Sequence, residues 1–125
     1  MAGIFVYNKK IENHDGEKNN YIITRPSILS NPYTHEPLER TQAMYRVKNR
    51  DAAIEKYDHY FDVMYVGDKE FKSLIDQMYE QYKNGEDIYL GCVCKPLPCH
   101  GDVIAKKLTS RLVKENFLNI RKKFG

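Results

Sequence analysis

The sequence contains no long hydrophobic run, and its N-terminus has no basic lead-in before an apolar stretch. A membrane-spanning helix needs about 20 consecutive apolar residues, and a secretory signal peptide begins with a positively charged segment. Neither kind of segment is therefore expected. We predict a cytoplasmic protein with no membrane contact.

Cysteine is scarce, and the three that are present, Cys92, Cys94 and Cys99, lie close together in the chain. Secreted domains held by disulfides usually carry an even number of cysteines spread along the sequence. The odd, clustered count argues against such a framework, so we expect reduced thiols.

A strong charge of one sign is also missing. The formal net charge is only +3, whereas domains that bind nucleic acid usually carry a pronounced basic patch, so nucleic acid is not the expected partner. Basic residues do concentrate near the C-terminus, where they form either the solvated face of a helix or a surface that attracts an anionic partner. They are Lys106, Lys107, Arg111, Lys114, Arg121, Lys122 and Lys123.

The composition that remains is that of one ordinary globular domain. The chain has 125 residues, of which 42% are hydrophobic and 30% charged. Because domains of about 100 to 150 residues are built around a single hydrophobic core, residues 1–125 are expected to form one domain.

The first part of the chain predicts two strands and a long loop. Residues 4–7 and 21–23 are apolar and rich in strand-forming residues, and a polar stretch separates them. Pro26 and Pro32 exclude a helix or a central strand from the next segment, because proline lacks a backbone donor. We expect that loop to continue as far as Arg50.

The second part predicts two helices, a strand and a third helix. Apolar residues spaced by three and four indicate helices that begin near Asp51 and Asp68, with Gly85 as the stop of the second. Residues 88–94 form an apolar run typical of a buried strand, and a third helix is expected to open around Gly101. The predicted fold class is α/β, a small single-domain sheet with helices packed on it, in the order β-β-loop-α-α-β-α.

A ligand site is expected between the last strand and the last helix. In α/β sheets, ligands bind beyond the carboxyl ends of the strands, where helix N-termini present free amides. Gly101 would let the backbone approach a ligand, and His100 can gain or lose a proton near neutral pH. Asp102 could cap the helix or orient a partner.

Three interpretations of the thiols and His100 remain open. Cys92, Cys94, Cys99 and His100 could hold zinc, although their spacing differs from the usual zinc patterns, and no metal is predicted. Cys99 could be a nucleophile, because a helix N-terminus and a neighbouring histidine both lower a thiol pKa. We favour the third, in which Cys92 and Cys94 pack in the core while Cys99 and His100 shape an anion pocket of backbone amides. No cofactor is predicted.

The proline-containing loop supplies the other half of this site. Arg25 can make bidentate contacts to phosphate or carboxylate, and Ser27 and Asn31 can add polar contacts around the same group. The alternative is that Arg25 pairs with a surface acid while Ser27 and Asn31 close turns.

Two segments resemble the motifs of a small uncharacterised domain frequent in bacteriophage and bacterial genomes. They are Arg25-Pro26-Ser27-Ile28-Leu29-Ser30-Asn31-Pro32-Tyr33 and Cys92-Val93-Cys94-Lys95-Pro96-Leu97-Pro98-Cys99-His100-Gly101-Asp102. The family patterns are G-R-P-S-x-L-G-N-P-F and C-x-C-x-P-x-x-C-H-G-D. The resemblance implies that both loops belong to one site, whose polar positions are Arg25, Ser27, Asn31, Cys99, His100 and Asp102. Thr24 and Ser30 stand where the family has glycines, and this departure affects catalysis more than binding.

The leading hypothesis is a phage-type accessory protein of the host cytoplasm with a pocket for an anionic, nucleotide-like small molecule. Arg25 would neutralise the anion, Ser27 and Asn31 would orient it, and the helix start at Gly101 would supply amides. If the protein is an enzyme, His100 is the expected general acid or base and Cys99 the candidate nucleophile, in hydrolysis or group transfer at a glycosidic or phosphate linkage.

The alternative is a non-catalytic phage protein that binds and inhibits a host protein or a nucleic-acid process. Its contacts would come from residues 34–50 or from the basic C-terminal end.

Overall fold

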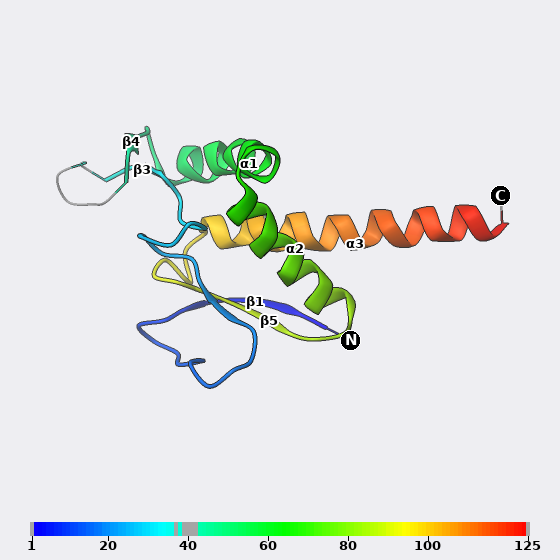
Figure 1. Ribbon diagram of the computed structural model, residues 1–125. Coiled ribbons are helices and arrows are strands. Elements are labelled where there is room, and N and C mark those ends of the chain that lie inside the picture. The colour runs from blue at the N-terminus through cyan, green and yellow to red at the C-terminus, as the bar shows by residue number, and fades with distance from the viewer. Residues whose placement is uncertain (1, 37, 39–42, 125) are drawn as a thin grey trace.

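The computed structural model describes residues 2–36, 38 and 43–124, which form a small sheet with helices on one side (Figure 1). The elements, in chain order, are β1 (Ile4–Asn8), β2 (Asn20–Ile22), β3 (Tyr33–Thr34), β4 (Tyr45–Arg46), α1 (Arg50–Gly67), α2 (Lys69–Lys83), β5 (Ile88–Cys92) and α3 (His100–Phe124). The α/β class and the predicted order are confirmed. The short strands β3 and β4 pair with each other within the predicted long loop, of which residues 37 and 39–42 lie outside the described part.

The main sheet has the strand order β1-β5-β2, and both pairings are parallel. Ile4 lies opposite Ile88, and Asn20 lies opposite Tyr89. Parallel neighbours need a crossover connection, which α1 and α2 provide between β2 and β5. The carboxyl ends of all three strands therefore meet at one edge of the sheet.

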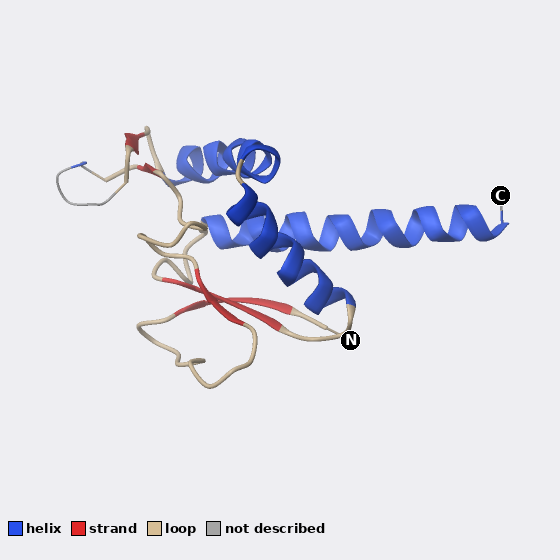
Figure 2. Ribbon diagram, viewed as in Figure 1, coloured by secondary structure: helices blue, strands red, loops and turns tan. Residues whose placement is uncertain are grey.

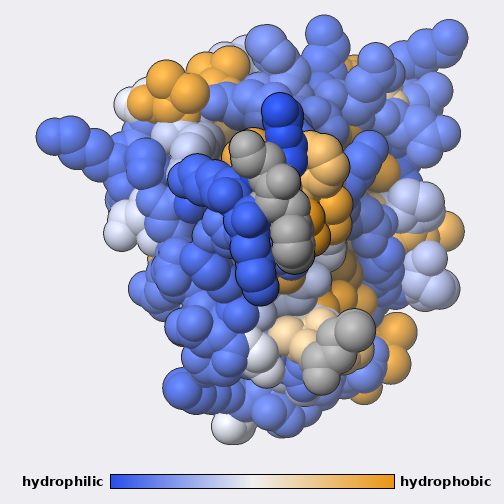
Figure 3. Space-filling model, turned by 90° about the vertical axis from the view of Figure 1, so that its right-hand side faces the viewer, coloured by the Kyte–Doolittle hydropathy of each residue, from blue (hydrophilic) through white to orange (hydrophobic). Residues whose placement is uncertain are grey.

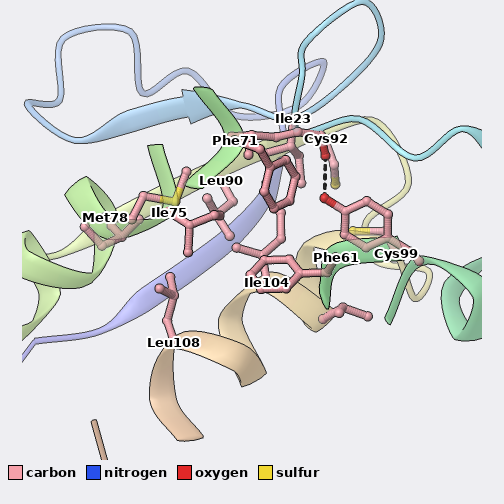
Figure 4. Close-up of a cluster of buried hydrophobic side chains, with 14 of the residues drawn as sticks. Ile23, Phe61, Phe71, Ile75, Met78, Leu90, Cys92, Cys99, Ile104 and Leu108 are labelled. Carbon is pink, nitrogen blue, oxygen red and sulfur yellow. Dashed lines mark hydrogen bonds between the residues drawn. The ribbon is translucent and has the colours of Figure 1, made fainter. Parts of the chain in front are cut away.

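The hydrophobic core lies between the sheet and the three helices, which share one face (Figure 2). Phe71, Ile75 and Met78 of α2 pack near Leu90 of β5, and Ile104 of α3 lies close by (Figure 4). These apolar positions recur every three or four residues in the helices and every second residue in β5, as the burial of one face requires. No helix within the described residues combines the length and hydrophobicity that crossing a bilayer would take.

The loop that follows β1 lies on the opposite side of the sheet (Figure 2). His14 from this loop stacks on Tyr89 with ring centroids 4.6 Å apart, and it also meets Tyr7 edge to face. The Tyr7 hydroxyl donates to Oδ1 of Asn20 at 2.5 Å. The central strand thus packs against helices on one side and contacts His14 of this loop on the other.

Side-chain caps fix where the helices begin. Oδ1 of Asn49 accepts from the amide of Ala52 at 2.8 Å, and Oδ1 of Asp68 accepts from the amide of Phe71 at 3.0 Å. Asp68 is thus the N-cap of the second helix, which begins where the sequence predicts. Gly85 follows α2 with φ of 91°, a conformation that favours glycine and ends the helix as expected.

Candidate functional site

A cavity of about 360 Å³ lies beyond the carboxyl ends of β2 and β5, where the two predicted loops meet. Its walls come from residues 23–36, from the start of α1 and from residues 92–100. Among the predicted site residues, Arg25, Asn31, Cys99 and His100 line the cavity. The other three, Ser27, Gly101 and Asp102, are not among its lining residues.

Backbone atoms of residues 23 and 29 join the first loop to the sheet and the helices. The amide of Ile23 donates to the carbonyl of Gly91 at 2.9 Å, and its carbonyl lies 2.8 Å from Nε2 of His100. The buried Tyr57 hydroxyl of α1 donates to the carbonyl of Leu29 at 2.7 Å. The loop is therefore held from three elements at once, which gives the cavity a defined wall.

Arg25 lines the cavity with its charge unbalanced. Its Nε atom is buried and has no hydrogen-bond partner, and within the described residues no carboxylate lies within ion-pair distance of its guanidinium. Burial lowers the pKa of Arg25, although a guanidinium stays charged at neutral pH. A half-buried cation without a counter-ion costs free energy, so this position is suited to an anion from outside the chain.

Ser27 and Asn31 use their side chains within the protein. Oγ of Ser27 accepts from the amide of Leu29 at 3.1 Å. Asn31 is buried, and its Oδ1 accepts from the amide of Tyr33 at 2.9 Å while its Nδ2 donates to the carbonyl of Ala53 at 3.1 Å. These are the bonds of residues that close turns, and Asn31 also ties the loop to α1.

His100 is the first residue of α3 and is buried between the two loops. Because a carbonyl can only accept, the Nε2 that faces Ile23 carries the hydrogen of the neutral ring, and Nδ1 is the basic nitrogen. Burial, assisted by the nearby charge of Arg25, lowers the pKa of His100 to about 4. At neutral pH the ring is uncharged, and a pKa of about 4 makes it a weak base, so the acid or base role of His100 stays a prediction.

The thiol pair differs from the expectation for Cys99. Its Sγ does accept from the amide of Gly101 at 3.3 Å, the contact expected at a helix N-terminus. However, a hydrogen bond to Cys92 and burial raise the pKa of Cys99. The same bond lowers the pKa of Cys92 to about 6. Burial and the neighbouring Cys92 thiol therefore oppose the activation of Cys99 that its place at a helix N-terminus favours, and the role of Cys99 as a nucleophile stays a prediction.

Asp102 is engaged in the first turn of α3. Its Oδ2 accepts from the amide of Cys99 at 3.1 Å, and its Oδ1 forms an ion pair with Nζ of Lys95 at 2.6 Å. It therefore caps the helix, one of the two roles considered for it. In the part of the chain that the structure describes, no three His, Cys, Asp or Glu side chains are grouped to hold a metal ion, so the zinc alternative finds no ligand set there.

Comparison with known families identifies the domain that contains this cavity. The family described as Domain of unknown function (DUF4326) matches residues 6–110, which include both loops and the start of α3. The chain belongs to the DUF4326 family. The expected membership of an uncharacterised domain family is thereby confirmed.

A bacteriophage protein is similar to a short part of this chain. The chain is 61% identical over 28 residues to the "Uncharacterized 12.4 kDa protein in nrdA-td intergenic region" of Enterobacteria phage T4. The match spans 22% of this chain and 25% of that relative, so the chain covers about a quarter of the relative's length. No solved structure matches the chain.

Gly101 serves the core of the DUF4326 domain rather than the cavity. A Cβ atom at this position would lie 2.7 Å from Cγ1 of Val6 and 2.9 Å from Cδ1 of Ile23. The structure shows a close approach of this backbone to the sheet, and the approach to a ligand stays a prediction. The missing side chain lets α3 begin directly against β1 and the end of β2.

We expect Gly101→Ala to lower the free energy of unfolding by about 1 to 3 kcal/mol, because the added methyl overpacks this contact. Urea denaturation of the two proteins measures the loss. Gly67→Ala is the matched control, since a Cβ there meets nothing within 4 Å. An equal change in both variants would show that the contact with Val6 and Ile23 is not the cause.

Sequence reasoning missed Arg50, which also lines the cavity. It is the first residue of α1, and no described carboxylate pairs with it. A charged residue at the start of a helix is usually solvated, so nothing in the sequence marked it. His35 and Glu36 line the cavity too, with Nε2 and Oε1 3.3 Å apart.

Proposed function

We propose that this DUF4326 domain binds an anionic, nucleotide-like small molecule in the cavity between its two loops. The observation that carries the proposal is the half-buried guanidinium of Arg25, which faces the cavity without a counter-ion. A phosphate or carboxylate there would replace the lost hydration with charge-assisted hydrogen bonds. Arg50, from the start of α1, also lines the cavity, and no described carboxylate pairs with it.

The rest of the cavity supports a ligand with an apolar part. Hydrophobic side chains of both loops and of α1 form part of the remaining wall, and the volume lies within the range of small-molecule pockets. These side chains are Ile23, Ala53, Ile54, Val93, Leu97 and Pro98. The Glu36 carboxylate can accept from sugar hydroxyls or base amines. A flat base joined to a phosphorylated sugar satisfies this combination better than inorganic phosphate alone.

Thermal-shift assays and native mass spectrometry can test this proposal. The panel consists of nucleoside phosphates, nucleotide sugars, cyclic dinucleotides and inorganic phosphate. A compound present at about 100 times its Kd adds about 2.7 kcal/mol to the stability of the folded state, so Tm rises by several degrees. We expect a shift with at least one nucleotide class and a smaller shift with phosphate. No shift across the panel would contradict the proposal.

Arg25→Gln distinguishes a binding role from a structural one. We expect this variant to lose about tenfold or more in affinity, because a charge-assisted contact is removed. Its Tm without ligand should stay the same or rise, because an uncompensated half-buried charge is removed. Arg121→Gln, at an exposed position of α3, is the control and should bind as the wild type does. A large loss of stability in Arg25→Gln with unchanged ligand affinity would overturn the assignment.

A further inference from the structure

The far half of α3 stands clear of the domain. The helix has 25 residues, about 37 Å at 1.5 Å per residue, and its C-terminal end projects beyond the other elements (Figure 1). Its first turns bury Ile104 and Leu108 in the core. Between Val113 and Ile120 the apolar side chains are exposed, and Figure 3, which views the molecule from the side toward which α3 points, shows hydrophobic side chains amid a mostly hydrophilic surface.

Three of these exposed side chains form one stripe. Val113, Phe117 and Ile120 are spaced by four and three residues, and they are 67%, 59% and 56% exposed. Phe117 lies nine residues after the buried Leu108, which at about 100° per residue places the two on opposite sides of the helix. The stripe therefore does not continue the face that packs in the core. It also lies outside residues 6–110, the part that matches the DUF4326 family.

The spacing and the flanks of the stripe indicate what covers it. Its spacing of four and three is that of a coiled-coil seam, beside which the exposed Leu118 adds a further apolar side chain. Lys114 and Arg121 border the seam, and no described carboxylate pairs with either. The nearby Glu115 is already engaged by Lys83 and Tyr79 of α2.

We infer that this seam docks an amphipathic helix of another protein, with apolar residues at the seam and acidic residues beside it. A second copy of this chain is a poor occupant, because its seam has the same basic borders and like charges facing each other are unfavourable. An acidic helix covers the apolar stripe and pairs with Lys114 and Arg121 at the same time. This surface is independent of the ligand cavity.

Two synthetic helices of about three heptads test the inference by fluorescence anisotropy with the full chain. Both carry Leu and Ile at the seam positions; one carries Glu beside the seam and the other Lys. We expect the Glu peptide to bind and the Lys peptide not to bind, with affinity for the Glu peptide falling as salt is raised. Equal binding of the two peptides, or no binding of either, would overturn the proposal.

Variants of the stripe complete the test. Phe117→Ser and Ile120→Ser should each weaken binding of the Glu peptide by about tenfold or more while leaving Tm unchanged, because these side chains do not pack in the core. Val66→Ser, at an apolar position of α1 that is 88% exposed, is the matched control and should bind normally. A concentration-dependent dimer in light scattering that Phe117→Ser abolishes would instead assign the stripe to a second copy. Adsorption to anionic phosphatidylserine vesicles without peptide binding would assign it to a membrane surface.

Discussion

Replacing Ile23 with alanine is expected to lower the free energy of unfolding by about 2 to 5 kcal/mol. The side chain is fully buried, and its Cδ1 atom lies 2.9 Å from the position that a Cβ on Gly101 would occupy. Truncation therefore leaves a cavity where the end of β2 meets the first turn of α3. Urea denaturation monitored by far-ultraviolet circular dichroism measures the loss.

The adjacent residue provides the control for this prediction. Ile22 has the same side chain on the other face of the sheet and is 37% exposed. Ile22→Ala should cost about 1 kcal/mol or less, because less surface is removed from a packed environment. Equal losses in the two variants would mean that the core does not close around Ile23 as described.

Acidification is expected to destabilise the protein through His100. The pKa of His100 is about 4 in the folded state, against an ordinary value of 6.5. Between these two pH values the unfolded chain binds a proton that the folded protein does not, so stability falls as the pH is lowered through this window. The full shift of the His100 pKa corresponds to a decrease of about 3 kcal/mol at most in the free energy of unfolding. Above about pH 7 this contribution no longer varies with pH.

Urea denaturation near neutral pH and at about pH 4.5 tests this prediction. His100→Gln should reduce the pH dependence in this window, whereas His59→Gln, at an exposed position of α1, should retain it. Asp76 titrates lower, since Lys72, Tyr65 and Arg111 hold its pKa at about 2, so its effect falls mainly below the window. An unchanged pH dependence in His100→Gln would contradict the assigned burial of a neutral ring.

The helices and the buried strand could be predicted, because they depend on the spacing of apolar residues that are close in sequence. The spacing of Phe71, Ile75 and Met78 defines one helix face, and the apolar run from residue 88 defines a buried strand. The neighbours in the sheet could not be predicted in this way. The insertion of β5 between β1 and β2 depends on contacts between segments that are far apart in the chain.

The same distinction applies to the site. Arg25 and His100 could be selected from the chemistry of their loops, and they line one cavity. The structural roles of Asn31 and Gly101 could not be predicted in this way. Asn31 bonds to a carbonyl of α1, and Gly101 packs against the side chain of Val6, and neither partner is close in sequence. The acidity of the thiols likewise depends on how Cys92 and Cys99 face each other. Residue type alone therefore indicated where the candidate site lies. It did not indicate which of the predicted residues support the fold and which line the cavity.

The central place of β5 determines when a newly made chain can fold. β1 and β2 do not pair with each other, so their backbone groups lack their sheet partner until residues 88–92 have left the ribosome. Growing chains therefore carry two unpaired strand segments while both intervening helices are synthesised, the period in which aggregation and proteolysis compete with folding. A chain interrupted before β5 would lack the middle of the sheet and, with it, one complete wall of the cavity.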